Sequence, residues 1–186
     1  HNPSNGDFSM STLFVNNLNT ASGTTITVPT GKQLIGTDTN SIKAPGMIIQ
    51  MQNSTLAGGS AQSSAASFTN TGLTCNITPK YSNSKILVLV HHVISVVTAS
   101  SHARCDFRCI ESGSGTEIYR MDYHGQDGTT ANTQRNMSGS GVFTCSNTNQ
   151  LTFATQFQKA NTTEGTIYYK WYTQSIHTMQ LLEIAQ

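Results

Sequence analysis

Few residues of this 186-residue chain are of the types that perform acid, base or nucleophilic chemistry, since it holds only nine Asp and Glu and six His. Glycoside hydrolysis needs two carboxylates that face one sugar. Asp122 and Asp127 share one polar stretch, but acids in loops more often hold turns. Serine is abundant, yet no Gly-x-Ser-x-Gly turn exposes a nucleophile. The sequence therefore predicts a protein that is not an enzyme.

Metal and phosphate sites are also poorly supported. His91 and His92 are neighbours on an expected strand, so their rings point to opposite faces and cannot hold one ion within one chain. One histidine per chain could form a three-nitrogen site on a threefold axis, but a hydrogen-bonded interface histidine is the simpler interpretation. Gly139-Ser140-Gly141 lacks the strand-to-helix context of a phosphate loop. We expect no metal and no cofactor.

The cysteines are well separated and lack the Cys-x-x-Cys spacing of zinc sites. They are Cys75, Cys105, Cys109 and Cys145. We expect buried thiols that act as small hydrophobic residues.

The polar stretch over residues 122–136 is the better candidate for binding an external ligand, because long loops are often functional. An aromatic ring there could stack on a sugar, and polar side chains could hydrogen-bond its hydroxyls. The expected receptor contacts are Tyr123, His124, Gln126 and Asp127. A second aromatic group, in residues 168–172, favours packing in a core or an interface.

The low charge of the chain excludes two classes of partner. Only 10% of residues are charged and the net charge is +1, against about 25% charged residues in an ordinary soluble domain. There is no basic face to neutralise phosphates, so we expect no nucleic acid. No apolar run reaches the roughly 18 residues of a membrane span, so we expect no membrane insertion.

The elements that must position these residues are short β-strands. Between eight and ten stretches of alternating apolar and polar residues are separated by turn signals, which is typical of a β-sandwich or jelly roll. We expect strands at residues 47–51, 73–78, 85–97, 103–112, 116–123, 137–146, 151–159, 165–173 and 177–184. Residues 53–67 indicate a loop or a weak edge strand. The chain is predicted to be all-β.

The first 45 residues differ from the rest. Residues 1–9 have no periodicity and indicate a flexible leader or a cloning remnant. Residues 10–45 contain apolar triplets too short to bury a face, and such strands need partners at their edges. An identical copy of the chain is the simplest partner, so we expect an intertwined N-terminal stem. The residues expected at contacts between copies are Leu13, Val15, Ile26, Val28, His91 and His92.

Three stretches of sequence resemble the head module of bacteriophage virion proteins, especially tail fibres. They are GMIIQMQNSTL (residues 46–56), FTNTGLTCNITPKYSNSKILVLV (68–90) and TMQLLEIAQ (178–186). The upstream MSTLFVNNLNTASGTTITVPTGKQLIGTD also resembles the beginnings of such proteins, so the resemblance covers residues 10–186.

The resemblance implies a homotrimer with a jelly-roll head at residues 46–186, similar in outline to tumour-necrosis-factor-like trimers. Its place would be the virion surface, joined to other virion proteins through the N-terminal segment. Three weak sites acting together would bind a glycan or protein of the host cell. The alternative is a capsid decoration or head-fibre protein with a purely structural role. A polysaccharide depolymerase is disfavoured by the scarcity of carboxylates.

Overall fold

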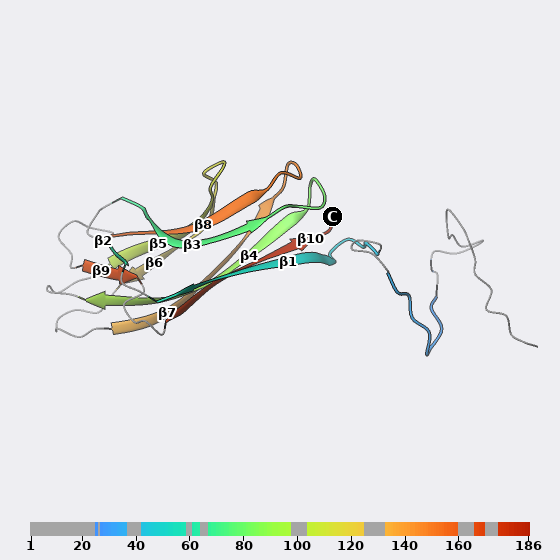
Figure 1. Ribbon diagram of the computed structural model, residues 1–186, viewed down its shortest axis with the longest axis horizontal. Helices are drawn as coiled ribbons and strands as arrows, with labels where there is room; N and C mark the ends of the chain where they lie inside the picture. Colours follow the sequence, from blue (N-terminus) through green and yellow to red (C-terminus); the bar gives the residue numbers. More distant parts are fainter. Residues whose placement is uncertain are drawn as a thin grey trace, which may run out of the picture. The chain divides into compact units, whose positions relative to one another are not determined.

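The chain is all-β over the part that this computed structural model describes, with two antiparallel sheets, an arrangement compatible with the expected β-sandwich (Figure 1). The structure describes Thr25 and residues 27–36, 42–58, 61–63, 67–97, 104–124, 133–159, 166–169 and 175–186. The description is confined to the backbone for residues 61–63, 94–97, 104, 123–124, 133–135 and 166–169. Within these ranges no helix is long and apolar enough to cross a membrane.

The chain divides into two compact units, His1–Ser41 and Ile42–Gln186, where we expected a boundary after residue 45. In the first unit, the described residues are exposed and contain a turn in which the Lys32 N–H donates to the Pro29 carbonyl at 3.0 Å. The short strands expected at residues 25–28 and 34–35 are not formed in the described parts of those segments.

The described residues of the second unit form ten strands. In chain order they are β1 (Ile48–Ala57), β2 (Ala61–Ser63), β3 (Thr69–Ile77), β4 (Lys85–Val97), β5 (Arg104–Glu111), β6 (Glu117–His124), β7 (Thr133–Thr144), β8 (Leu151–Lys159), β9 (Thr166–Tyr169) and β10 (Ile176–Ile184). Each of the nine expected strands has a counterpart, and β2 lies in the stretch expected as a loop or weak edge. The polar stretch at 122–136 is shorter as a connection than expected, because β6 and β7 extend into it from both sides.

The larger sheet is four ribbons wide. Along one side of β4, β10 pairs with Lys85–His91 and β9 pairs with Ile94–Val97, while β7 pairs along the other side. Beyond them, β1 pairs with β10 and β2 pairs with β9. The ribbon order is therefore β1/β2, β10/β9, β4 and β7.

The smaller sheet has the strand order β3-β8-β5-β6. Most connections carry the chain from one sheet to the other, and β5–β6 is the hairpin expected around Gly113-Ser114-Gly115. Glu111 holds this turn, because its carboxylate accepts hydrogen bonds from the backbone N–H groups of Gly113 and Ser114 at 2.9 and 2.7 Å.

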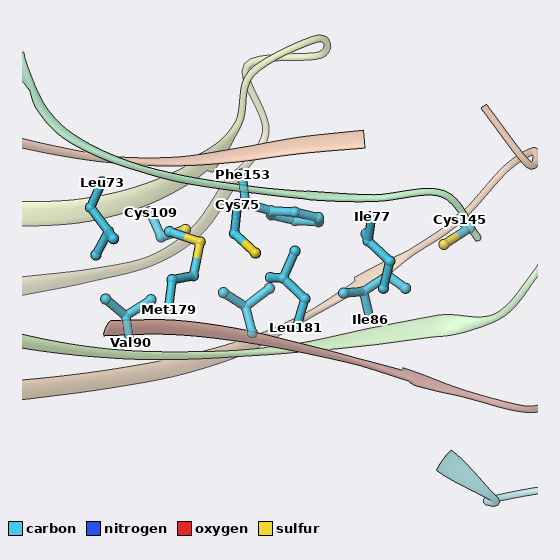
Figure 2. Packing of buried hydrophobic residues seen from close by; sticks show 11 residues of the cluster. Leu73, Cys75, Ile77, Ile86, Val90, Cys109, Cys145, Phe153, Met179 and Leu181 are labelled. Carbon is cyan, nitrogen blue, oxygen red and sulfur yellow. The ribbon is translucent and has the colours of Figure 1, made fainter. Parts of the chain in front are cut away.

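Strand alternation builds the core between the sheets. Every second residue of β3 from Thr71 to Ile77 is buried, and the same holds for β10. Side chains from both sheets meet there, with Leu73 and Phe153 on the smaller sheet and Met179 and Leu181 on the larger one (Figure 2). All four cysteines are buried, as the sequence predicts.

Gly139 and Gly141 are required by close packing between β7 and β6. A Cβ on Gly141 would lie 2.5 Å from the Ile118 carbonyl oxygen, and one on Gly139 would overlap the Tyr119 ring. The Gly-Ser-Gly motif is therefore explained by close approach of two strands, which agrees with its rejection as a phosphate loop.

Glu183 is fully buried at the junction of three segments. Its carboxylate accepts hydrogen bonds from Gln50 Nε2 of β1 at 2.6 Å and from the backbone N–H groups of Lys80 and Tyr81 at 2.9 and 3.2 Å. Burial raises the pKa of this carboxyl, but the hydrogen bonds from Gln50, Lys80 and Tyr81 lower it by more, so the pKa lies below its ordinary value. Glu183 is therefore ionised at neutral pH.

We predict that Glu183→Gln lowers the free energy of unfolding by about 2–4 kcal/mol, because an amide cannot accept all of these hydrogen bonds and leaves buried donors unsatisfied. Urea unfolding at pH 7 measures the change. Glu117→Gln is the matched control, since Glu117 is exposed and pairs with Arg120 at the surface; its cost should stay within about 1 kcal/mol. Equal costs for the two variants would contradict the structural role of Glu183.

Candidate functional site

A groove of about 370 Å³ lies on the outer face of the larger sheet, where β10, β4 and β7 run side by side. Strand register brings its residues together in two adjacent rows. Thr178, His91 and Ser138 form one row, and Gln180, Leu89 and Ser140 form the next. The residues come from three strands that are far apart in the sequence, so pairing within the sheet creates the groove.

The chemistry of the groove is that of neutral hydrogen bonding. His91 Nδ1 lies 3.2 Å from Ser138 Oγ, within hydrogen-bond distance. Hydroxyl, amide and imidazole groups offer both donors and acceptors here. Among the described residues, no carboxylate faces this side of the sheet to orient the imidazole, so the pair is not part of a Ser-His-Asp triad within them.

An apolar row crosses the same outer face beside the groove. Met51, Leu182, Leu87 and Val142 occupy one register row that reaches from β1 at one edge to β7 at the other. The side chains at the two edges are more than half exposed, with 59% for Met51 and 54% for Val142. The face thus combines an exposed apolar row with an uncharged polar groove.

The two outer faces of the domain differ in charge. Among the outward-facing residues of β1, β10, β4 and β7 whose side chains are described, Lys85 is the one formally charged residue. The outer face of the smaller sheet instead carries Asp106, Arg108, Glu117, Arg120 and Asp122. Arg120 pairs with Glu117 at 2.8 Å, and the Arg108 guanidinium lies 3.8 Å from the Phe68 ring centre. The smaller sheet therefore presents a charged surface.

The four residues expected to contact a receptor are only partly placed. Tyr123 and His124 lie at the end of β6, where their backbones pair with Cys105 and Arg104 of β5. Gln126 and Asp127 lie outside the described residues. Tyr123 therefore lies within the strand expected at residues 116–123, and His124 belongs to the end of this strand and not to the expected loop.

The residues expected at contacts between copies have four different placements. Leu13, Val15 and Ile26 lie outside the described residues, and Val28 is exposed. His91 lines the groove on the outer face.

His92 points to the interior instead, where it is fully buried within one chain and so has no surface left for a contact between copies. Its ring centre lies 5.5 Å from that of Phe107 and 6.0 Å from that of His177. Burial, followed by electrostatic repulsion from His177 and His91, lowers the pKa of His92 from 6.5 to about 3. His92 is therefore neutral at physiological pH.

No metal site is found among the described side chains, where no three His, Cys, Asp or Glu residues lie close enough to hold an ion. The residues that sequence reasoning missed are the polar groups of the groove, namely Ser138, Ser140, Thr178 and Gln180. The available signal was the alternation of polar residues along two expected strands. It marks an outward face but does not reveal which strands are neighbours.

Comparisons with known proteins give only distant likenesses. No protein-family model and no curated protein matches the chain. Latent PorU from Porphyromonas gingivalis is 12% identical over 76% of the chain, with a TM-score of 0.41, and the chain spans 14% of that structure. VP2 of infectious bursal disease virus, in a subviral particle, is 12% identical over 82% of the chain, with a TM-score of 0.38, and the chain spans 46% of it. Likeness this distant supports no statement about what this chain binds or does.

We predict that acid weakens the fold through His92. The unfolded chain binds a proton at this imidazole near pH 6.5, whereas the folded chain resists it down to about pH 3. The contribution of neutral His92 to the free energy of unfolding is therefore fully present above pH 6.5. It falls as the pH drops below this value, by about 2 kcal/mol at pH 5. Urea unfolding at pH 7 and pH 5, at fixed protein concentration, measures the loss.

The variant His92→Gln carries a neutral side chain at every pH and should lose less stability than the wild type over this interval. Glu183 does not interfere, because its pKa lies below the ordinary 4.5. The same loss in both proteins would show that His92 is not the acid-sensitive group.

Proposed function

We propose that residues 46–186 are the jelly-roll head of a homotrimeric virion surface protein of the bacteriophage tail-fibre type, which binds a host receptor without catalysis. What supports the jelly roll is a set of four antiparallel pairs, β1 with β10, β3 with β8, β4 with β7, and β5 with β6. These pairs correspond to one long hairpin, folded at β5–β6 and rolled into two four-ribbon sheets. Such rolling is the topology of a jelly roll, which occurs in viral capsid and lectin domains.

The homotrimer is proposed from the N-terminal segment. Its large apolar side chains among the described residues, Val28, Leu34, Ile35 and Ile42, are exposed. The free energy falls when apolar side chains leave water. The apolar stretches of residues 10–45 are too short to bury these side chains within one chain. Sister copies supply the missing partner in this proposal, and the same segment would join other virion proteins.

The receptor role is proposed from the resemblance to phage virion proteins and from the polar connection between β6 and β7. Three equivalent sites on one trimer would bind a surface glycan or protein through effective concentration. The chain carries nine acidic residues in 186, which favours binding over glycan cleavage, because cleavage needs a positioned carboxylate pair.

We predict a mass in solution near three times 20.0 kDa for the full chain. Light scattering coupled to size-exclusion chromatography measures it over a range of protein concentrations. A stable monomer near 20.0 kDa would overturn the trimer and, with it, the fibre-type assembly.

We predict that replacing Tyr123, His124, Gln126 and Asp127 together by Ala lowers adsorption of the labelled protein to cells of the bacterial host at least tenfold. The loss is expected to be large because the three sites of one trimer bind together, so weakening each site lowers the overall affinity by more than the loss at one site. The control replaces four residues of another exposed polar connection, Ser146, Asn147, Thr148 and Asn149, by Ala. Unchanged adsorption of the first variant would refute this receptor site, and a wild type that never adsorbs would favour capsid decoration.

A further inference from the structure

The outer face of the larger sheet exposes apolar side chains of the kind that are usually buried in a protein interface. Its apolar row, Met51, Leu182, Leu87 and Val142, runs without interruption across all four ribbons. Ile48 and Ile176, also more than half exposed, add apolar surface near the two ends of the face. Isolated exposed apolar residues are common on proteins, but a contiguous row of them marks an interaction surface.

The electrostatic cost of burial separates the two outer faces. Burying a charge is expensive unless it is paired and hydrogen-bonded. The smaller sheet would bring five charged residues into an interface, including Arg108 and Arg120 directly opposite each other. The larger sheet would bring only Lys85, at the end of β4, among its described outward residues. Of the two faces, the larger sheet can be buried at low cost.

The size of the face is sufficient for association. Four ribbons spaced about 4.8 Å apart, each contributing strands of about nine residues at roughly 3.4 Å per residue, cover about 600 Å². A standard protein interface uses about 800 Å² from each partner. The face therefore supplies most of one partner's share before any loop or N-terminal segment is added.

We propose that this face turns toward a threefold axis shared with two sister chains, so that further copies of this chain are its occupant. The inference rests on the homotrimer proposed above. Met51 and Val142 lie at opposite edges of the sheet but in the same register row. A ring of three copies brings the β7 edge of one head against the β1 edge of the next, which is a heterologous contact that closes. The apolar row then continues from copy to copy.

A partner of another kind is a poorer match for this surface. A glycan gains from stacking on aromatic rings and a charged protein from pairing with opposite charge, but the described outward side chains of this face include no Phe, Tyr or Trp and one charged residue, Lys85. The described outward residues here are mainly Ser, Thr, Asn, Gln and aliphatic side chains. In the groove, His91 and Ser138 already lie within hydrogen-bond distance of each other, which lowers the cost of removing them from water.

Cysteine labelling of the full chain tests this inference. The four native cysteines are buried, so a single cysteine introduced by Ser140→Cys reports on the larger sheet and one introduced by Thr74→Cys reports on the smaller sheet. Both positions are exposed strand residues in one chain. We expect a maleimide dye to react at least tenfold more slowly with Ser140→Cys than with Thr74→Cys. Equal rates in a protein of trimer mass would overturn this inference and leave the trimer standing.

A charge variant provides a second measurement. Met51→Glu combined with Val142→Glu places carboxylates at both edges of the row, and should raise the labelling rate of Ser140→Cys at least fivefold. The control, Asn70→Glu combined with Asn76→Glu, places two separated carboxylates at exposed positions of the smaller sheet and should leave that rate unchanged. An equal effect of the two pairs would overturn the inference. A wild type of monomer mass would overturn both this inference and the proposed function.

Discussion

The buried carboxylate of Glu183 fixes how the first and last strands of the domain, β1 and β10, meet the turn between the sheets. It accepts hydrogen bonds from Gln50 on β1 and from the backbone of Lys80 and Tyr81, where the chain passes from the smaller sheet to the larger. A strand that slips by one residue turns every side chain to the other face. Because Glu183 must point inward to reach these donors, Leu182 must point outward. The composition of the outer face of the larger sheet follows from this choice.

Two polar groups of the interior must both be deprotonated, which leaves one of them charged and the other neutral. Glu183 must be ionised to accept its hydrogen bonds, and the pKa of this carboxyl lies below 4.5. His92 must be neutral, because burial beside Phe107 and His177 opposes its charge. Both groups are deprotonated at neutral pH. As the pH falls, the fold begins to lose the stabilising contribution of His92 before that of Glu183, because the unfolded pKa of histidine is higher. The polar interior therefore gives the fold a preferred pH range as well as a fixed register.

Local patterns in the sequence were sufficient to predict the strands, because alternation and β-branched content act over short distances. Lys85–Val97 and Leu151–Lys159 lie where the pattern placed them. The pattern was insufficient where pairing over a long distance decides the structure. Residues 133–136 are polar and read as loop, but they form a strand because β4 extends beside them and satisfies their backbone groups. β2 is a three-residue strand of Ala, Gln and Ser, and it depends in the same way on β9.

The groove and the apolar row could not be predicted for the same reason. Alternation predicted that His91 and His92 face opposite ways, but only the neighbouring strands decide which of them is inside. His91 and Ser138 are 47 residues apart in the sequence and adjacent in the sheet. A row such as Met51, Leu182 and Leu87 exists only once β1, β10 and β4 are in register. The low charge of the whole chain was visible from the start, yet its unequal division between the two outer faces depends on topology, and that division determines which face can be covered.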